Sequence, residues 1–225
     1  MNVLAIIQAR MNSTRLPGKV MMPLGGMSVV ELCERRVRRS GVATLIAYPR
    51  NDDAEIGSYT RTLGFGPPAF YGFPWGGPEN DVLGRYIACA TSQHPWPDII
   101  VRITADCPLV LPEWIQEMVG ELLAGGAQYV GGRYDGVKGW DVEAFTIGAL
   151  LKAAGDIERE HVTTAMQLRY LPRSYTWGDR GDVSLTLDTQ EDYDRLTAIV
   201  NKLKNPVTAS AQDILAAWEE VRATA

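Results

Sequence analysis

The stretch NVLAIIQA at residues 2–9 is followed directly by RMNSTRLPGK at residues 10–19. The first segment is a continuous apolar run, which is typical of a strand buried on both faces of a parallel sheet. The second segment combines three cations with a Pro-Gly pair, so we expect it to form a polar loop at the end of that strand. Ser28 and Glu31 have the spacing of a capping box and predict a helix that continues to about Arg39.

Short apolar runs and amphipathic stretches alternate along the rest of the chain. Residues 73–79 contain two prolines and two glycines and are expected to be irregular, and the pattern also loosens over 133–145. Strands that alternate with helices predict an α/β fold with a mostly parallel sheet and helices on both faces. Further strands are expected at 43–48, 69–71, 98–104, 128–131 and 182–187, and further helices at 52–63, after Asn80 or Asp81, and at 112–124, 146–154, 158–170, 190–202 and 211–222.

Composition limits the classes of function that the chain can have. The 225 residues carry a net charge of −5, which disfavours a polynucleotide partner. No apolar run approaches the ~20 residues that a membrane-spanning helix needs. Three cysteines without metal-ligand spacing predict reduced thiols in a cytoplasmic protein, and the presence of only two histidines argues against a His-based zinc site. Because no linker-like segment interrupts them, residues 1–225 are expected to form a single domain.

Three polar clusters follow expected strands of the sheet. Ligands of open α/β sheets bind at the carboxyl ends of the strands, so we expect these clusters to meet in one crevice. Three cations suit a triphosphate, and two separated carboxylates suit Mg²⁺, which binds few protein oxygens. The first loop is neither a P-loop nor a dinucleotide-binding GxGxxG turn. The clusters are Arg10, Arg15 and Lys19 after the first strand, Asp106 after a middle strand, and Asp188 after the last strand.

Segments that span nearly the whole chain resemble one enzyme family. They are similar to the cytidylyltransferases that activate sugar acids to their CMP derivatives, the acylneuraminate type and especially the SpsF-type branch of spore-coat polysaccharide synthesis. The first segment is the most specific, because arginine, Ser/Thr, arginine and Pro-Gly-Lys at this spacing have little use in a generic fold. The segments are IIQARMNSTRLPGKVMMPLGG at 6–26, NDVLGRY at 80–86, VRITADCPLV at 101–110, GWDVEAF at 139–145, EREHVT at 158–163 and LTLDTQEDYDRL at 185–196.

The resemblance implies a Rossmann-like nucleotidyltransferase fold, CTP as the donor, Mg²⁺ as the cofactor and an acidic small-molecule acceptor. That acceptor would be a sialic, pseudaminic or Kdo-like sugar acid, or a related acid such as a phosphonate. The resemblance also implies a homodimer, with residues 131–145 as the expected contact. Carried over residue by residue, it assigns Ala9, Arg10, Ser13, Arg15, Lys19, Asp81, Arg85 and Asp106 to nucleotide binding, with catalytic roles for Lys19, Arg10 and Arg15; it assigns Asp106 and Asp188 to the metal, and Asp141, Glu143, Arg159, Glu160 and His161 to the acceptor side.

Other interpretations of the same residues stay open at this stage. The fold would also suit a nucleotidyltransferase that uses another nucleoside triphosphate, or a non-catalytic, glycosyltransferase-like module that only binds a nucleotide. Asp188 and Thr189 favour helix N-caps and could merely begin the helix at 190–202. His161 could be a hydrogen-bonded residue of the core.

Overall fold

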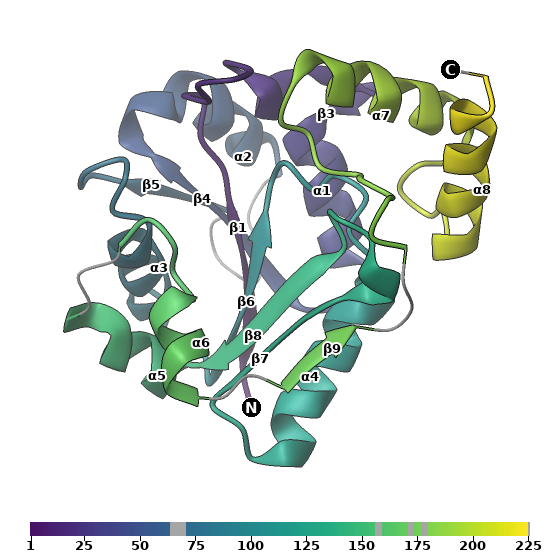
Figure 1. Cartoon of the computed structure of the whole chain (residues 1–225). Coiled ribbons are helices and arrows are strands. Elements are labelled where there is room, and N and C mark those ends of the chain that lie inside the picture. The colour runs from purple at the N-terminus through teal and green to yellow at the C-terminus, as the bar shows by residue number, and fades with distance from the viewer. Residues whose placement is uncertain (64–70, 156–158, 171–172, 177–179, 225) are drawn as a thin grey trace.

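One seven-stranded sheet forms the centre of the fold (Figure 1). The structure is a computed structural model that describes the chain except for residues 64–70, 156–158, 171–172, 177–179 and 225. The strand order is β5-β4-β1-β6-β8-β7-β9. Strand β8 runs antiparallel to β6 and β7, whereas the other neighbouring strands are parallel. The expected mostly parallel sheet is therefore confirmed. The strands are β1 (Val3–Gln8), β4 (Ala43–Pro49), β5 (Gly72–Trp75), β6 (Ile99–Thr104), β7 (Tyr129–Arg133), β8 (Asp141–Thr146) and β9 (Arg173–Thr176), with a small separate pair, β2 (Pro23–Leu24) and β3 (Met27–Ser28).

Helices cover both faces of the sheet, as expected (Figure 1). Among the described residues, none of these helices is both long and apolar enough to cross a membrane. One face carries α1 (Val29–Arg38), α2 (Ser58–Thr62), α4 (Pro112–Gly125), α7 (Gln190–Lys202) and α8 (Ala211–Arg222), and the other carries α3 (Val82–Thr91), α5 (Ile147–Lys152) and α6 (Thr164–Tyr170). Short helical turns lie at Lys19–Met21, Arg50–Asp52, Asp53–Gly57, Tyr134–Gly136 and Ala153–Gly155.

Side-chain alternation along β1 explains why this strand lies in the middle of the sheet. Ala5 and Ile7 pack into the core beneath α1 and α4, whereas Leu4 and Ile6 pack beneath α3. All four side chains are buried, because a central parallel strand has helices on both of its faces. The run is continuously apolar because both faces of this central strand are buried.

The structure corrects several expected elements. Residues 73–79 are not wholly irregular, because β5 pairs with the free edge of β4 and tolerates Pro74 as an edge strand. Residues 182–187 form no ladder; they make one isolated bridge, between Ser184 and Lys138. The helix expected at 158–170 begins at Thr164 in the described part. The strand expected at 69–71 lies mostly outside the described residues, and β9 was not expected.

Arg36 fastens the C-terminal part of the chain to the first helix. Its side chain is fully buried and donates from Nε to the carbonyl of Val110 at 2.8 Å. Its two terminal nitrogens donate to the carbonyls of Pro206 at 2.6 Å and Ala209 at 3.1 Å. Burial lowers the pKa of Arg36 to about 10. One side chain thus joins α1 to the start of α4 and to the connection between α7 and α8.

Arg36→Met should lower the free energy of unfolding by about 3 kcal/mol or more, because it leaves three carbonyls without their donor. Chemical denaturation measures the change. Arg35→Met is the matched control, since the Arg35 side chain is 54% exposed and pairs with Glu31 along the helix. Its cost should stay below about 0.5 kcal/mol. Equal effects of the two substitutions would contradict the anchoring role.

Candidate active site

The loop after β1 is folded back on itself around one carbonyl group. The carbonyl of Met11 accepts hydrogen bonds from the amides of Ser13 at 3.0 Å and Gly18 at 2.8 Å. Gly18 has a φ of 72°, in the left-handed region that side chains other than glycine rarely adopt. This turn brings the chain into a short helical turn whose first residue, Lys19, is only 8% exposed. The Pro-Gly-Lys sequence therefore serves to turn a lysine inward.

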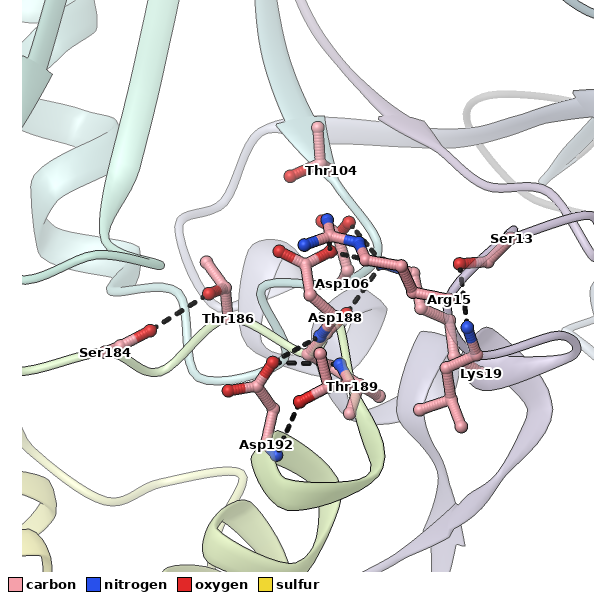
Figure 2. A network of polar contacts seen from close by, with 12 residues as sticks. Ser13, Arg15, Lys19, Thr104, Asp106, Ser184, Thr186, Asp188, Thr189 and Asp192 are labelled. Carbon is pink, nitrogen blue, oxygen red and sulfur yellow. Dashed lines mark hydrogen bonds and ion pairs between the residues drawn. The ribbon is translucent and has the colours of Figure 1, made fainter.

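The ammonium group of Lys19 lies between two carboxylates (Figure 2). Its Nζ donates to Asp106 Oδ2 at 2.8 Å and to Asp188 Oδ1 at 3.0 Å. A third bond, of 2.6 Å, goes to the carbonyl of Leu187. Lys19, Asp106 and Asp188 come from three distant parts of the sequence. The fold therefore brings together residues that were selected because each follows an expected strand.

Two cations, Lys19 and Arg15, form ion pairs with the acids at this centre. Burial by itself lowers the pKa of Lys19, but Asp106 and Asp188 more than offset that effect and raise the pKa above its ordinary value. Arg15 adds a second cation, with Nη2 at 3.0 Å from Asp188 Oδ1 and its side chain 64% exposed. Lys19 is therefore held as a charged group, and Arg15 extends the positive charge towards solvent.

The start of α7 fixes Asp188 without using its side chain as a cap. Thr189 is the N-cap and accepts from the amide of Asp192 at 3.3 Å. Asp192 in turn accepts from the amides of Asp188 at 3.0 Å and Thr189 at 2.9 Å, which completes a capping box. The interpretation of Asp188 as a helix cap is thus wrong, because Thr189 has that role and the Asp188 carboxylate faces Lys19 (Figure 2).

A cleft of about 360 Å³ opens beside this centre. Most of the residues expected to hold the triphosphate and metal line it. Gln8 and Thr104 also line it and were not expected, although both end strands at the same edge, so the rule that selected Asp106 could have found them. The lining residues are Gln8, Arg10, Ser13, Thr14, Arg15, Lys19, Val20, Thr104, Asp106 and Asp188.

Asp81 and Arg159, expected near the nucleotide and the acceptor respectively, are paired with each other. Asp81 caps α3 by accepting from the amide of Gly84 at 2.8 Å, and it accepts from Arg159 Nε at 2.7 Å. Burial raises the pKa of Asp81, but Arg159 and the Gly84 amide outweigh it, so the pKa lies below its ordinary value. The pair ties the segment before α6 to the start of α3.

Arg85, expected near the nucleotide, contacts the backbone at the end of β1. It is fully buried and donates to the carbonyls of Ala9 at 3.3 Å and Glu79 at 2.6 Å. It therefore holds the end of β1 against the loop that precedes α3. Direct contact of Ala9, Asp81 or Arg85 with a nucleotide stays a prediction.

Two of the expected acceptor residues, Asp141 and Glu143, lie on β8, the strand next to β6. Asp141 accepts from Arg133 Nε at 2.7 Å at the start of β8. Glu143 accepts from Arg102 at 2.7 Å and from the hydroxyl of Tyr129 at 2.6 Å. The antiparallel register pairs Arg102 with Glu143, so the start of β8 lies at the carboxyl end of β6, the edge that carries Asp106.

Two further acceptor candidates lie in the segment before α6. Glu160 Oε1 is 3.7 Å from Arg10 Nη2, which links that segment to the loop after β1. His161 follows it, and its carbonyl accepts from the amide of Thr164 at the start of α6. Glu160 therefore contacts Arg10, which is one of the residues that line the cleft.

The donor set of the cleft suits a hard cation with few protein ligands. Within the described part of the chain, no group of three or more His, Cys, Asp and Glu side chains is arranged to hold a metal ion. Asp106 and Asp188 nevertheless share one cation, the Lys19 ammonium, which shows that both carboxylates reach a common position. Two carboxylates completed by water or phosphate oxygens are what Mg²⁺ prefers.

Comparison with known proteins gives a consistent result. Residues 4–138 match the family model described as Cytidylyltransferase. The spore coat polysaccharide biosynthesis protein SpsF of Bacillus subtilis is 28% identical over 95% of this chain and 92% of its own length. The 3-deoxy-manno-octulosonate cytidylyltransferase of Anaeromyxobacter dehalogenans is 30% identical over 56% of this chain and 49% of its own length. A solved cytidylyltransferase from Leptospira borgpetersenii is 26% identical, with a TM-score of 0.85 over 100% of this chain and 95% of that one.

The partly buried ion pair between Glu143 and Arg102 leads to a prediction about the pH dependence of stability. Burial raises the pKa of Glu143, but Arg102 and the Tyr129 hydroxyl outweigh it and lower the pKa below the ordinary 4.5. A lowered pKa in the folded state means that the carboxylate stabilises the fold above pH 4.5 and loses this contribution as the pH falls through the folded-state value.

Glu143→Gln should therefore cost about 2–4 kcal/mol at pH 7, and the cost should shrink as the pH falls from about 5 to about 3. Urea denaturation at each pH measures it. Glu55→Gln, at an exposed glutamate, is the matched control and should change stability little at any pH. A cost that is the same at pH 7 and pH 3 would argue against an ionised Glu143 in the fold.

Proposed function

Since this chain belongs to the cytidylyltransferase family, we propose that it transfers the CMP part of CTP to an acidic sugar and releases pyrophosphate. The acceptor class that we propose is a sialic, pseudaminic or Kdo-like sugar acid, or a related small acid such as a phosphonate. The names of two relatives support this class: one acts in spore coat polysaccharide biosynthesis and one on 3-deoxy-manno-octulosonate. The observation that carries the proposal is the meeting of Lys19, Asp106 and Asp188 in one cleft.

The loop after β1 supplies the groups that a triphosphate needs. Arg10, Arg15 and the Ser13 hydroxyl line the cleft beside Lys19, and the first two stay partly exposed, so they can reach a ligand that enters from solvent. In our proposal they bind the phosphates and align the α-phosphorus with the attacking oxygen of the acceptor. In the proposed transfer, the acceptor oxygen attacks in line with the departing pyrophosphate. Negative charge accumulates on the phosphate oxygens in the transition state.

Lys19 would neutralise that charge next to the reacting phosphorus. It is buried, charged and fixed by three hydrogen bonds, so little reorganisation is needed when the charge develops. Asp106 and Asp188 would hold Mg²⁺, which when bound supplies a second positive charge and can acidify an acceptor hydroxyl. An acceptor that attacks through a carboxylate or phosphonate needs no general base, and we assign none.

Two further features belong to the proposal. We propose a cytoplasmic enzyme, where its donor CTP is available, and a homodimer. The segment expected to form the dimer contact is partly occupied within the chain, because Trp140 is buried and donates to the carbonyl of Leu109 at 2.9 Å. Tyr134 packs edge-on against both Trp140 and Trp114. A dimer contact on this segment would therefore use its remaining exposed side chains.

A pyrophosphate-release assay tests the proposed function. CTP, UTP, GTP and ATP are each combined with Mg²⁺ and with a panel of sialic, pseudaminic, legionaminic and Kdo-type acids and phosphonates. We expect release with CTP and at least one acid. Release with another nucleotide only would assign a different donor. Binding of CTP without release for any acid would favour the non-catalytic nucleotide-binding module.

Variants at the charged centre show whether the cleft is responsible. Asp106→Asn and Lys19→Ala should each reduce release by at least 100-fold, because each removes a charge that acts on the transferring phosphate. Lys152→Ala, at an exposed lysine in the last turn of α5, is the control and should keep wild-type turnover. Circular dichroism spectra confirm that each variant is folded. Turnover close to wild type in a folded Asp106 or Lys19 variant would remove that residue from the mechanism.

A further inference from the structure

Two buried polar atoms without a described hydrogen-bond partner lie on the α3 face of the sheet, on the neighbouring strands β1 and β6. Strand alternation places Gln8 on the α3 face with Leu4 and Ile6, whereas Ala5 and Ile7 lie on the α1 face. The same alternation places Arg102 on the α3 face beside Ile100. Gln8 Oε1 and Arg102 Nε are both buried and have no hydrogen-bond partner in the described part of the chain.

Gln8 differs from the other residues at this edge because its side-chain oxygen has no hydrogen-bond donor among the described residues. Arg102 is paired with Glu143 through Nη1, and Thr104 has Cys107 Sγ at 3.3 Å from its hydroxyl. The carboxamide of Gln8 makes no hydrogen bond to the described residues, although Gln8 lines the cleft. A buried amide oxygen without a donor is costly, so such an atom in a binding cleft indicates a donor that a ligand brings.

The position of Gln8 indicates which ligand brings that donor. The parallel register places Gln8 directly beside Thr104, and β6 in turn lies beside β8 with its acceptor candidates Asp141 and Glu143. The cations that suit a triphosphate come instead from the loop after β1. Gln8 and Thr104 are the uncharged side chains at the strand ends that continue the cleft from the charged centre towards β8.

We propose that Gln8 determines acceptor specificity, by accepting a hydrogen bond from a hydroxyl group of the sugar acid next to the atom that attacks CTP. This inference rests on the proposed function. A neutral amide suits this position, because a carboxylate there would repel both the anionic acceptor and the triphosphate. Since the amide oxygen makes no hydrogen bond to the part of the chain that the structure describes, the carboxamide can rotate towards the ligand without losing one.

Gln8→Met tests the inference, because methionine keeps the length of the side chain and removes the hydrogen bond. Steady-state kinetics use CTP and the panel acid with the highest turnover, with 3-deoxy-manno-octulosonate measured alongside. The KM for the acid should rise roughly 3- to 10-fold, while the KM for CTP stays within about twofold. In the ligand-free protein the unfolding midpoint should rise by roughly 2–4 °C, since a buried unpaired oxygen is removed. Gln212→Met, at an exposed glutamine of α8, is the control and should change neither the two KM values nor the unfolding midpoint.

The outcomes separate this inference from the function on which it rests. A wild-type chain that releases no pyrophosphate rejects the proposed function and this inference with it. An active wild type whose Gln8→Met variant keeps the same KM for the acid, or loses affinity for CTP instead, rejects only the role of Gln8. A Gln8→Met variant with a lower unfolding midpoint also rejects it, because that result would show a structural role for the amide.

Discussion

The hydrogen bonds from the Lys19 ammonium to Asp106 and Asp188 are the interaction on which the rest of the site depends. Two carboxylates that reach the same ammonium group would repel each other if that cation were absent. Lys19 supplies that cation from within the chain, and a third bond to the carbonyl of Leu187 fixes its position. The protein can therefore hold two acids beside the loop after β1 before any ligand arrives. In the function that we propose, the same cleft also binds Mg²⁺ together with the triphosphate of CTP.

The fold is organised so that these three residues meet. Strands β1 and β6 are parallel neighbours, so the loop that carries Lys19 and the turn that carries Asp106 leave the sheet at the same edge. Asp188 reaches that edge because the chain before α7 runs alongside, with the amide of Leu187 donating to the carbonyl of Asp106 at 2.9 Å. The left-handed turn at Gly18 positions Lys19, and the capping box of Thr189 positions Asp188. Arg36 holds the C-terminal helices in place behind them.

Much of this arrangement was predictable from the sequence, because local rules govern it. A continuous apolar run marks a central strand, capping residues such as Ser28 and Thr189 mark helix starts, and polar residues after strands mark the binding edge. What escaped prediction depends on contacts distant in sequence. Pro74 can lie in a strand only because β5 is an edge, and the pairing of Glu143 with Arg102 follows from the register of β6 and β8. Gln8 lies within the apolar run at 2–9 and gave no separate signal, and only the structure shows that its amide oxygen has no donor among the described residues.

A crystal structure with a non-hydrolysable CTP analogue and Mn²⁺ in place of Mg²⁺ tests the central claim most directly, since the anomalous signal of manganese locates the metal without interpretation of nearby density. The account predicts one manganese peak bound by carboxylate oxygens of both Asp106 and Asp188, with the phosphates on Arg10, Arg15 and Lys19. Manganese and nucleotide bound elsewhere, for instance in the cavity between α7 and α8 that Lys202 and Lys204 line, would contradict it.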